Sequence, residues 1–181
     1  MPKYNPEIHH RRSIRLKGYD YSQPGLYFIT ICVHNREHLF GEIVGGKMEM
    51  NDAGKIAEQE WLKTAEMREN VELLEYVIMP NHMHGIILLN DRGGTMRRAP
   101  TIEQFGKPTS NTIPTIVRGY KSAVTKKINM LRNMPGVPVW QRNYYEHIIR
   151  DQKSYYHIAK YIRNNPQKWQ DDRFSSQRRR I

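Results

Sequence analysis

The sequence predicts an α+β domain: an antiparallel sheet with helices on one face and a further C-terminal helix after the last strand. Short runs rich in β-branched and aromatic residues alternate with segments whose apolar residues recur at helical spacing. The predicted order is strand, helix, strand, strand, helix, strand, helix. The first six elements are the split βαβ pattern of the ferredoxin-like fold. A chain of 181 residues is long enough for one domain with a core and short for two.

The first half of the chain supplies three of the four expected sheet strands. Asn51 or Asp52 can cap a helix, and the short Pro80-Asn81 break makes the two strands around it antiparallel neighbours. The expected elements are a basic arm (1–24), a strand (25–33), a loop or small hairpin (39–50), a helix (51–68) and two strands (71–79 and 82–89).

The second half begins with a mobile linker near 90–114, rich in Gly, Pro, Thr and Ser. A helix (115–131), a strand (144–149) and a final helix follow; Asp151 can cap this helix and Pro166 ends it. Residues 170–181 are expected to be a basic tail, which leaves 25–169 as the folded domain.

The charge of the chain points to a polyanion partner. Lys and Arg number 29 against 18 Asp and Glu, a formal net charge of +11, and the excess gathers in 9–17, 118–132 and 178–180. No long uncharged apolar run is present, and the N-terminus lacks the apolar centre of a signal peptide. We therefore expect no membrane association and a cytoplasmic location.

Two histidines interrupt an apolar strand in VIMPNHMHGIILL (77–89). His82 and His84 are two residues apart, so both side chains point to the same face of the strand. Two imidazoles side by side on a sheet make a metal chelate or a phosphate site. The alternative is that the pair fills a half-polar sheet face.

The final helix carries a second constellation. His157, Tyr161 and Asn165 are four residues apart in sequence and share one helix face. The alternative makes Tyr161 a core aromatic and Asn165 a C-terminal cap. A phenol has a pKa near 10 and is a feeble nucleophile, but it can attack phosphorus when a divalent cation polarises the phosphate. The two constellations together therefore predict a phosphotyrosine link to a nucleic acid.

The segment MPNHMHGIILL resembles the His-hydrophobic-His motif of HUH nucleases. The segments IVRGYKSAVTKKIN, VWQRNYYEHIIRD and YIRNNPQKW resemble those of single-tyrosine transposases, and more narrowly of the REP-associated tyrosine transposase group. The resemblance covers about residues 12–169. The order of these motifs along the chain makes the resemblance specific, whereas the His-x-His motif alone would be weak evidence for it.

The resemblance implies a transposase-like endonuclease that cuts single-stranded DNA beside a hairpin with a short flanking recognition sequence. Tyr161 matches the nucleophile, which leaves a 5′-phosphotyrosine and a free 3′-OH that can reverse the reaction or join another end. His82, His84 and Asn165 match the metal ligands, and Mg²⁺ or Mn²⁺ is the expected cation. A bacterial enzyme of this kind belongs in the cytoplasm, at the nucleoid. Insertion-sequence relatives swap the tyrosine helix between subunits and the repeat-associated group works as a monomer, so monomer and homodimer both stay open.

Other residues compete for these roles. Tyr144, Tyr145, Tyr155 and Tyr156 are alternative nucleophiles on chemistry alone. Tyr144 and Tyr145 point to opposite faces of their strand; these two and Trp140 are expected to be core or DNA-stacking residues. His157 is an alternative third ligand. His147 either holds a ligand in place or is an ordinary buried histidine.

The DNA contacts are expected from two basic segments. The arm residues are Arg11, Arg12, Arg15 and Lys17, which the resemblance places near the bases flanking the hairpin. Arg118 and Lys121 share a helix face and either meet phosphates or solvate the helix.

A different class of function competes with the enzyme: a non-catalytic single-stranded nucleic-acid-binding protein with a ferredoxin-like fold. The aromatic signature of RNA-recognition modules is absent, however. A structural zinc protein is disfavoured, because the chain has one cysteine and no second spaced ligand pair.

Overall fold

The computed structural model describes residues 19–91, 112–172 and 174–175. Its elements are β1 (Gly25–Cys32), a 3₁₀ turn η1 (His34–Arg36), β2 (Gly41–Val44), β3 (Lys47–Met50), α1 (Asp52–Glu66), β4 (Val71–Met79), β5 (His82–Leu89), α2 (Ile113–Leu131), β6 (Tyr145–Ile149), α3 (Gln152–Asn164) and a second 3₁₀ turn η2 (Trp169–Asp171).

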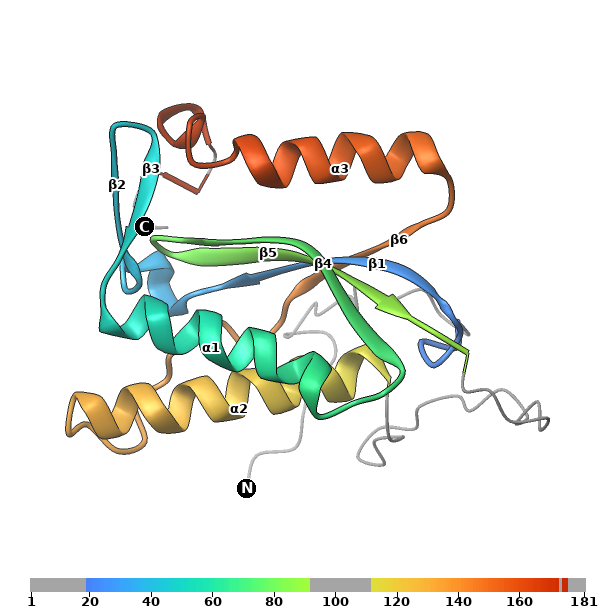
Figure 1. The fold of residues 1–181 in the computed structure, drawn as a ribbon. Coiled ribbons are helices and arrows are strands. Elements are labelled where there is room, and N and C mark those ends of the chain that lie inside the picture. The colour runs from blue at the N-terminus through green and yellow to red at the C-terminus, as the bar shows by residue number, and fades with distance from the viewer. Residues whose placement is uncertain (1–18, 92–111, 173, 176–181) are drawn as a thin grey trace, which may run out of the picture.

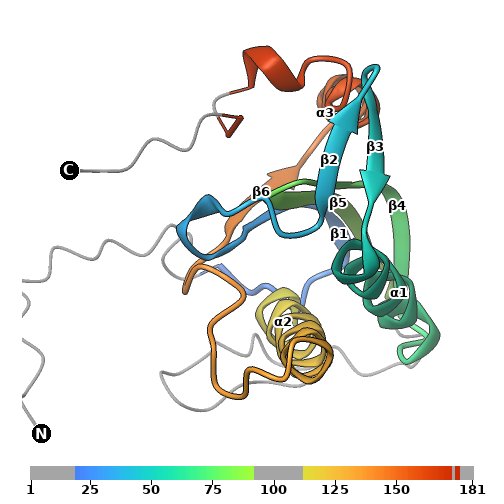
Figure 2. The same cartoon turned by 90° about the vertical axis from the view of Figure 1, so that its left-hand side faces the viewer.

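Four of these strands form an antiparallel sheet in the order β4-β5-β1-β6. Helices α1 and α2 lie side by side under one face, and α3 crosses the other face (Figures 1 and 2). This strand order and the placement of α1 and α2 are those of a split βαβ fold, so the predicted fold class is confirmed.

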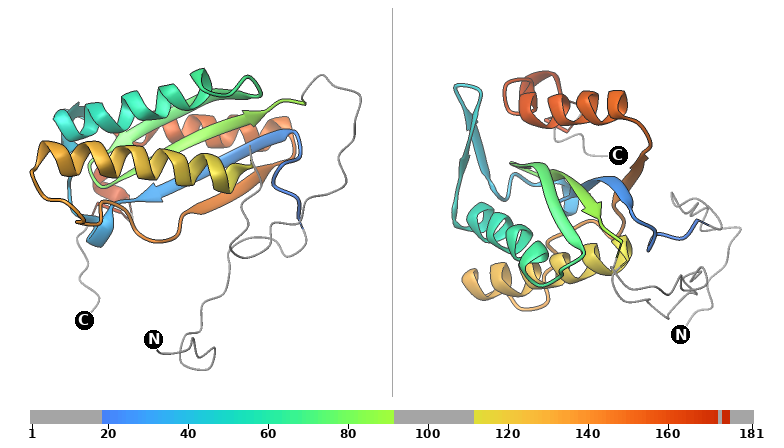
Figure 3. Two further views of the ribbon diagram at one scale, coloured as in Figure 1. Left: turned by 90° about the horizontal axis from the view of Figure 1, so that it is seen from below. Right: turned by 45° about the vertical axis from the view of Figure 1, so that its right-hand side comes forward.

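The larger core lies between the sheet and the α1–α2 layer (Figure 3, left). Alternate residues of β1 and β5 point into it, among them Tyr27, Ile29 and Met83. Trp61 of α1 is fully buried there and lies against β5 at Gly85, where an added Cβ would come within 2.4 Å of the indole ring. The absence of a side chain at Gly85 therefore lets α1 approach the sheet.

The face under α3 holds a smaller apolar cluster. Phe28, Ile86 and Ile149 of the sheet pack against Ala159 and Ile162 of α3. Partly buried aliphatic residues of the sheet pack against this cluster, and the same face also carries the two histidines of β5.

The β2–β3 hairpin stands beside the C-terminal end of α3 (Figures 1 and 3). Its two-residue turn is Gly45-Gly46, with φ of 56° and 76°, the left-handed conformation that such hairpin turns require. Gly46 approaches the backbone of Gln167. The hairpin therefore supports the turn that follows α3, and the expected small hairpin in 39–50 is confirmed.

Helix α2 begins at Ile113, two residues before the predicted start. Pro114 lies in its first turn, where a missing N–H costs no hydrogen bond, and the Thr112 side chain caps the helix. The far end of the predicted linker near 90–114 is therefore helical.

The remaining linker beyond Asp91, the arm up to residue 18 and residues 176–181 lie outside the described residues, so the boundaries of arm, linker and tail stay predictions. Within the described ranges, no helix has the length and apolar character needed to span a membrane.

Candidate metal and tyrosine site

His82 and His84 lie at the start of β5, on the face covered by α3. They pair across the ladder with Cys32 and Thr30 of β1, and both imidazoles are buried. Their two Nε2 atoms are 3.1 Å apart. The prediction that the pair shares one face is therefore confirmed.

Asn81 orients the His82 ring. Its Nδ2 donates to the carbonyl oxygens of Arg36 and Phe174, at 3.2 and 2.8 Å. That arrangement turns the Asn81 oxygen towards His82 Nδ1, 2.9 Å away, so Nδ1 carries the hydrogen. Because a neutral imidazole carries one hydrogen, the acceptor nitrogen is Nε2, the atom that faces His84.

His84 is held by its neighbours on β1. The Thr30 hydroxyl lies 2.8 Å from His84 Nδ1, and the Phe28 ring stacks on the imidazole with 5.4 Å between centroids. These contacts direct His84 Nε2 away from the sheet ladder, towards His82 and α3.

Tyr161 reaches this pair from α3. Its hydroxyl lies 3.1 Å from His84 Nε2, and the residue keeps 42% of its surface exposed. Asp151 caps the start of α3 by accepting from Ser154 N, and Tyr155 donates to Glu75 of β4 at 2.8 Å, a bond that raises the pKa of Tyr155. The helix is thus fixed at its N-terminal end and against the sheet, which places Tyr161 between solvent and the histidines.

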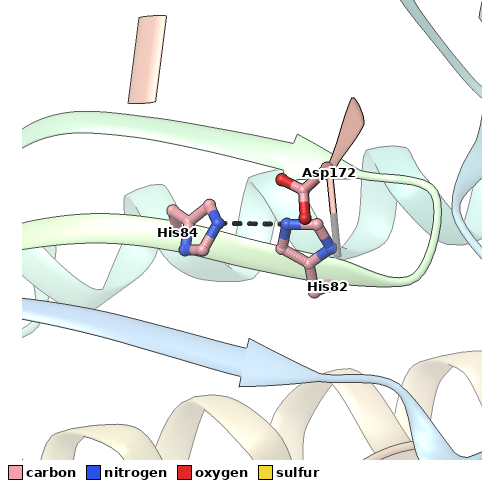
Figure 4. Close-up of side chains that lie close together, drawn as sticks. All are labelled: His82, His84 and Asp172. Atoms are coloured by element: carbon pink, nitrogen blue, oxygen red, sulfur yellow. Dashed lines mark hydrogen bonds between the residues drawn. The ribbon is translucent and has the colours of Figure 1, made fainter. Parts of the chain in front are cut away.

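The chain after α3 turns back over the site. Asp172 lies so close to the histidines that one ligand atom from each of the three residues falls within 4.8 Å of the others (Figure 4). Asn165, predicted as the third ligand, donates from Nδ2 to Asp172 Oδ2 at 3.1 Å. The Phe174 ring packs on His82 with centroids 4.5 Å apart.

Asp172 and Phe174 were not among the sequence-predicted site residues, and both fall in the expected tail. Their contacts arise because the chain reverses after α3 through η2. One signal was available: Asp171 and Asp172 are the only acidic residues after position 165 in an otherwise basic segment.

This donor set fits a small divalent cation. Two imidazole nitrogens bound at right angles to one ion, each at about 2.1 Å, lie about 3.0 Å apart, close to the separation of the two Nε2 atoms. Asn165 Oδ1 is buried and has no hydrogen-bond partner among the described residues. Such an unsatisfied acceptor beside a carboxylate suits a hard cation that takes oxygen ligands.

An open pocket of about 440 Å³ leads to Tyr161. Its lining includes Tyr161 and Asn165, the carboxylates Asp171 and Asp172, the cations Lys160 and Lys168, and the exposed His157. The alternative ligand His157 is therefore near the nucleophile but outside the cluster formed by His82, His84 and Asp172.

The remaining predicted residues lie elsewhere. His147 is exposed on the edge strand β6, so it is not a buried histidine. Arg118 and Lys121 belong to α2, across the sheet from Tyr161 (Figure 2). Lys121 donates to the carbonyl oxygens of Gln141 and Arg142, and burial lowers its pKa to about 8. Arg11, Arg12, Arg15 and Lys17 lie outside the described residues.

The competing aromatic residues separate into two groups. Trp140 is buried in the large core and Tyr144 packs against it. Tyr145 instead lies on the face with the histidines, with its ring 6.2 Å from that of Phe28. The prediction that Tyr144 and Tyr145 point to opposite faces is confirmed.

Comparison with known proteins identifies relatives of this chain. It is 49% identical over 176 residues to an uncharacterized protein of Haemophilus influenzae (strain ATCC 51907 / DSM 11121 / KW20 / Rd), covering 94% of this chain and 96% of that protein. The chain belongs to the same family as that protein. The sequence matches no model of a known protein family.

The fold is similar to that of a solved REP-associated tyrosine transposase bound to a REP hairpin. The TM-score is 0.56 at 23% identity, over 93% of this chain and 74% of the other. At this identity the similarity establishes a shared fold.

Proposed function

We propose that this protein is a metal-dependent endonuclease and strand transferase for single-stranded DNA, of the single-tyrosine HUH type, which cuts beside a DNA hairpin. The observation that carries the proposal is the 3.1 Å approach of the Tyr161 hydroxyl to His84 Nε2, which itself lies 3.1 Å from His82 Nε2. The shared fold with a transposase that binds a REP hairpin supports it.

His82, His84 and Asn165 are the proposed cation ligands, and Asp172 contributes a neighbouring negative charge. A bound Mg²⁺ or Mn²⁺ would polarise the phosphate and stabilise the charge on the leaving oxygen. Lys160 and Lys168 in the pocket leading to Tyr161 attract the DNA backbone.

Tyr161 forms the covalent bond. Its phenol gives up a proton as its oxygen attacks phosphorus, the bond from phosphorus to the 3′ oxygen breaks, and that oxygen takes up a proton. The products are a 5′-phosphotyrosine and a free 3′-OH. Attack by a 3′-OH on the phosphotyrosine reverses the step or joins a new end.

The test is covalent capture. Labelled single-stranded oligonucleotides from hairpins flanking the gene are mixed with protein, with and without Mg²⁺ or Mn²⁺, and separated on a denaturing gel. We expect a metal-dependent adduct that is lost in Tyr161→Phe and kept in Tyr156→Phe, a matched change on an exposed tyrosine of the same helix. An adduct that survives Tyr161→Phe would move the nucleophile elsewhere. Tight binding without any adduct would favour the non-catalytic binder.

The third ligand is tested by measuring the affinity of the protein for Mn²⁺. The electron paramagnetic resonance signal reports the concentration of the free ion. Removal of groups that merely orient ligands weakens metal binding about 10- to 100-fold. We therefore expect Asn165→Ala to weaken Mn²⁺ binding at least this much. If Asp172→Ala weakens it and Asn165→Ala does not, Asp172 is the ligand and the sequence-based assignment is wrong.

A single chain supplies Tyr161, His82 and His84, so we propose that one subunit is sufficient for cleavage. The check is complementation between Tyr161→Phe and His84→Ala proteins. If the tyrosine helix were swapped between subunits, a mixed dimer would rebuild one intact site and restore the adduct. We expect the mixture to stay inactive.

A further inference from the structure

The second aromatic feature on this face is Tyr145, which the reaction above does not use. It keeps 43% of its surface exposed although it lies on a strand of the central sheet. Helix α3 packs most closely against β4, and β6 is the edge strand on the other side of the sheet (Figures 1 and 3). An exposed aromatic ring at this place offers a flat apolar surface to solvent.

Tyr145 is connected to the metal and tyrosine site through β1. Thr30 is the ladder partner of both His84 and Tyr145, so the two side chains lie on one face, two strands apart, or about 10 Å. Phe28 fills the space between them. Its ring contacts those of His84, Tyr145 and Tyr161, at centroid distances of 5.4, 6.2 and 6.4 Å.

The pocket beside Tyr145 differs from the one beside Tyr161. It measures about 440 Å³, and its lining includes Tyr145, His147, Arg150, Asp151 and Glu146. Its two carboxylates outnumber its one cation, Arg150, which disfavours a phosphate, whereas hydrogen-bond donors and acceptors next to an aromatic ring suit a neutral base. The pocket beside Tyr161 also has two carboxylates, Asp171 and Asp172, but Lys160 and Lys168 balance them, so this pocket suits the phosphodiester better.

We propose that Tyr145 is a base-stacking residue: its ring and the adjoining pocket hold an unpaired nucleobase of the DNA strand next to the phosphodiester that Tyr161 attacks. This inference rests on the proposed function for the identity of the strand. A base stacked on Tyr145 holds the DNA strand in a fixed position relative to Tyr161, because the Phe28 ring contacts the rings of both tyrosines.

The first test is spectroscopic. The probe is the flanking hairpin oligonucleotide that gives an adduct. If none does, the oligonucleotide that binds most tightly is used. The fluorescent base 2-aminopurine replaces one unpaired base at a time. Stacking on an aromatic ring quenches this base. With Tyr161→Phe protein and no added metal, we expect quenching at one position. Tyr145→Ala should remove it, and Tyr145→Phe should keep it.

The second test is affinity on the same oligonucleotide. Tyr145→Ala should weaken binding about 5- to 150-fold, and an abasic nucleotide at the quenched position should remove the difference between the variants. Tyr156→Ala is the matched control, an exposed tyrosine on α3 whose hydroxyl accepts from Gln152. An unchanged affinity or an unchanged quenching profile in Tyr145→Ala overturns the proposal.

These outcomes are separable from failure of the catalytic proposal, because covalent capture is measured on the same oligonucleotide. If quenching depends on Tyr145 but no adduct forms, the stacking proposal is supported and the cleavage proposal is rejected. An adduct without a Tyr145-dependent signal sustains cleavage and rejects stacking.

Discussion

The two faces of the sheet differ in how much apolar surface they bury and in the polar groups they carry. Under α1 and α2 the sheet buries a large and almost wholly apolar core, with Trp61 at its centre. Under α3 the apolar cluster is small, and the same face carries His82, His84 and the exposed Tyr145 and Tyr161. Because burial of apolar area is the main stabilising term, the first face can stabilise the fold while the second keeps polar groups in place for the proposed reaction.

Trp61→Ala should have the largest effect on stability. It removes a fully buried indole from the large core, and we expect a loss of about 3–5 kcal/mol in the free energy of unfolding, measured by urea denaturation. The rate of adduct formation per folded molecule should stay unchanged, because Trp61 lies across the sheet from Tyr161. A slower reaction of the folded fraction would show that the two faces are coupled.

Ile162→Ala makes the corresponding change under α3. We expect a loss of about 2 kcal/mol, at the low end for this substitution, because the cluster is small. Here the adduct should also form more slowly, since Ile162 packs the helix that positions Tyr161. Denaturation and initial rates would be measured together, with Tyr156→Ala as the control. A normal rate would mean that α3 keeps its place without this contact.

Asp151→Ala should have a smaller effect. The Asp151 carboxylate accepts from Ser154 N and Ser154 Oγ at the start of α3, and loss of such a cap costs about 1 kcal/mol. Hydrogen exchange should rise in the first turn of α3 and stay unchanged in α1 and α2. Lys153→Ala, an exposed change in the same turn, is the comparison, and equal exchange in both variants would contradict a capping role.

Glu60 gives the smallest expected effect, and it concerns pH. Burial raises the pKa of the Glu60 carboxyl, but hydrogen bonds from Lys127 and Lys63 outweigh burial and hold the pKa below 4.5, its ordinary value. A lowered pKa in the folded state stabilises the protein above pH 4.5, and this stabilisation is lost as the pH falls through the folded pKa.

The contribution should be about 1 kcal/mol or less, because the lysine partners are partly exposed and screened. Glu60→Gln should therefore flatten the dependence of stability on pH in acid, as followed by denaturation at several pH values. The exposed Glu49→Gln serves as the reference. An unchanged slope in Glu60→Gln would place the acid-sensitive group elsewhere.

The difference between the faces also explains what could be predicted from the sequence. The large core leaves periodic signals, so the helices and strands were predicted nearly to their ends. The split βαβ pattern predicted the fold class, and the observed strand order is the one that belongs to it. The His82–His84 pair was predictable because strand alternation is local. Asp172 and Phe174 were missed because their contacts depend on a reversal of the chain after α3, which leaves no periodic trace.

The stacking candidates show the same limit. Trp140, Tyr144 and Tyr145 are equivalent by composition, and alternation showed only that Tyr144 and Tyr145 diverge. Which of the three remained uncovered depended on where α3 ends its contact with the sheet. Only the folded molecule distinguished Tyr145 from the other two.

His84 and Gly85 point to opposite faces of β5, so the proposed cation site forms only when β5 pairs with β1 in the correct register. If β5 slipped by one residue against β1, its side chains would exchange faces. Depending on the direction of the slip, His84 or Ile86 would then meet the Trp61 ring, where even one added carbon lies too close. Molecules that refold with this error would lack both the packed core and the imidazole pair. If the imidazole pair binds Mn²⁺ as proposed, titration with this ion would count the correctly paired fraction of a refolded sample before any DNA is added.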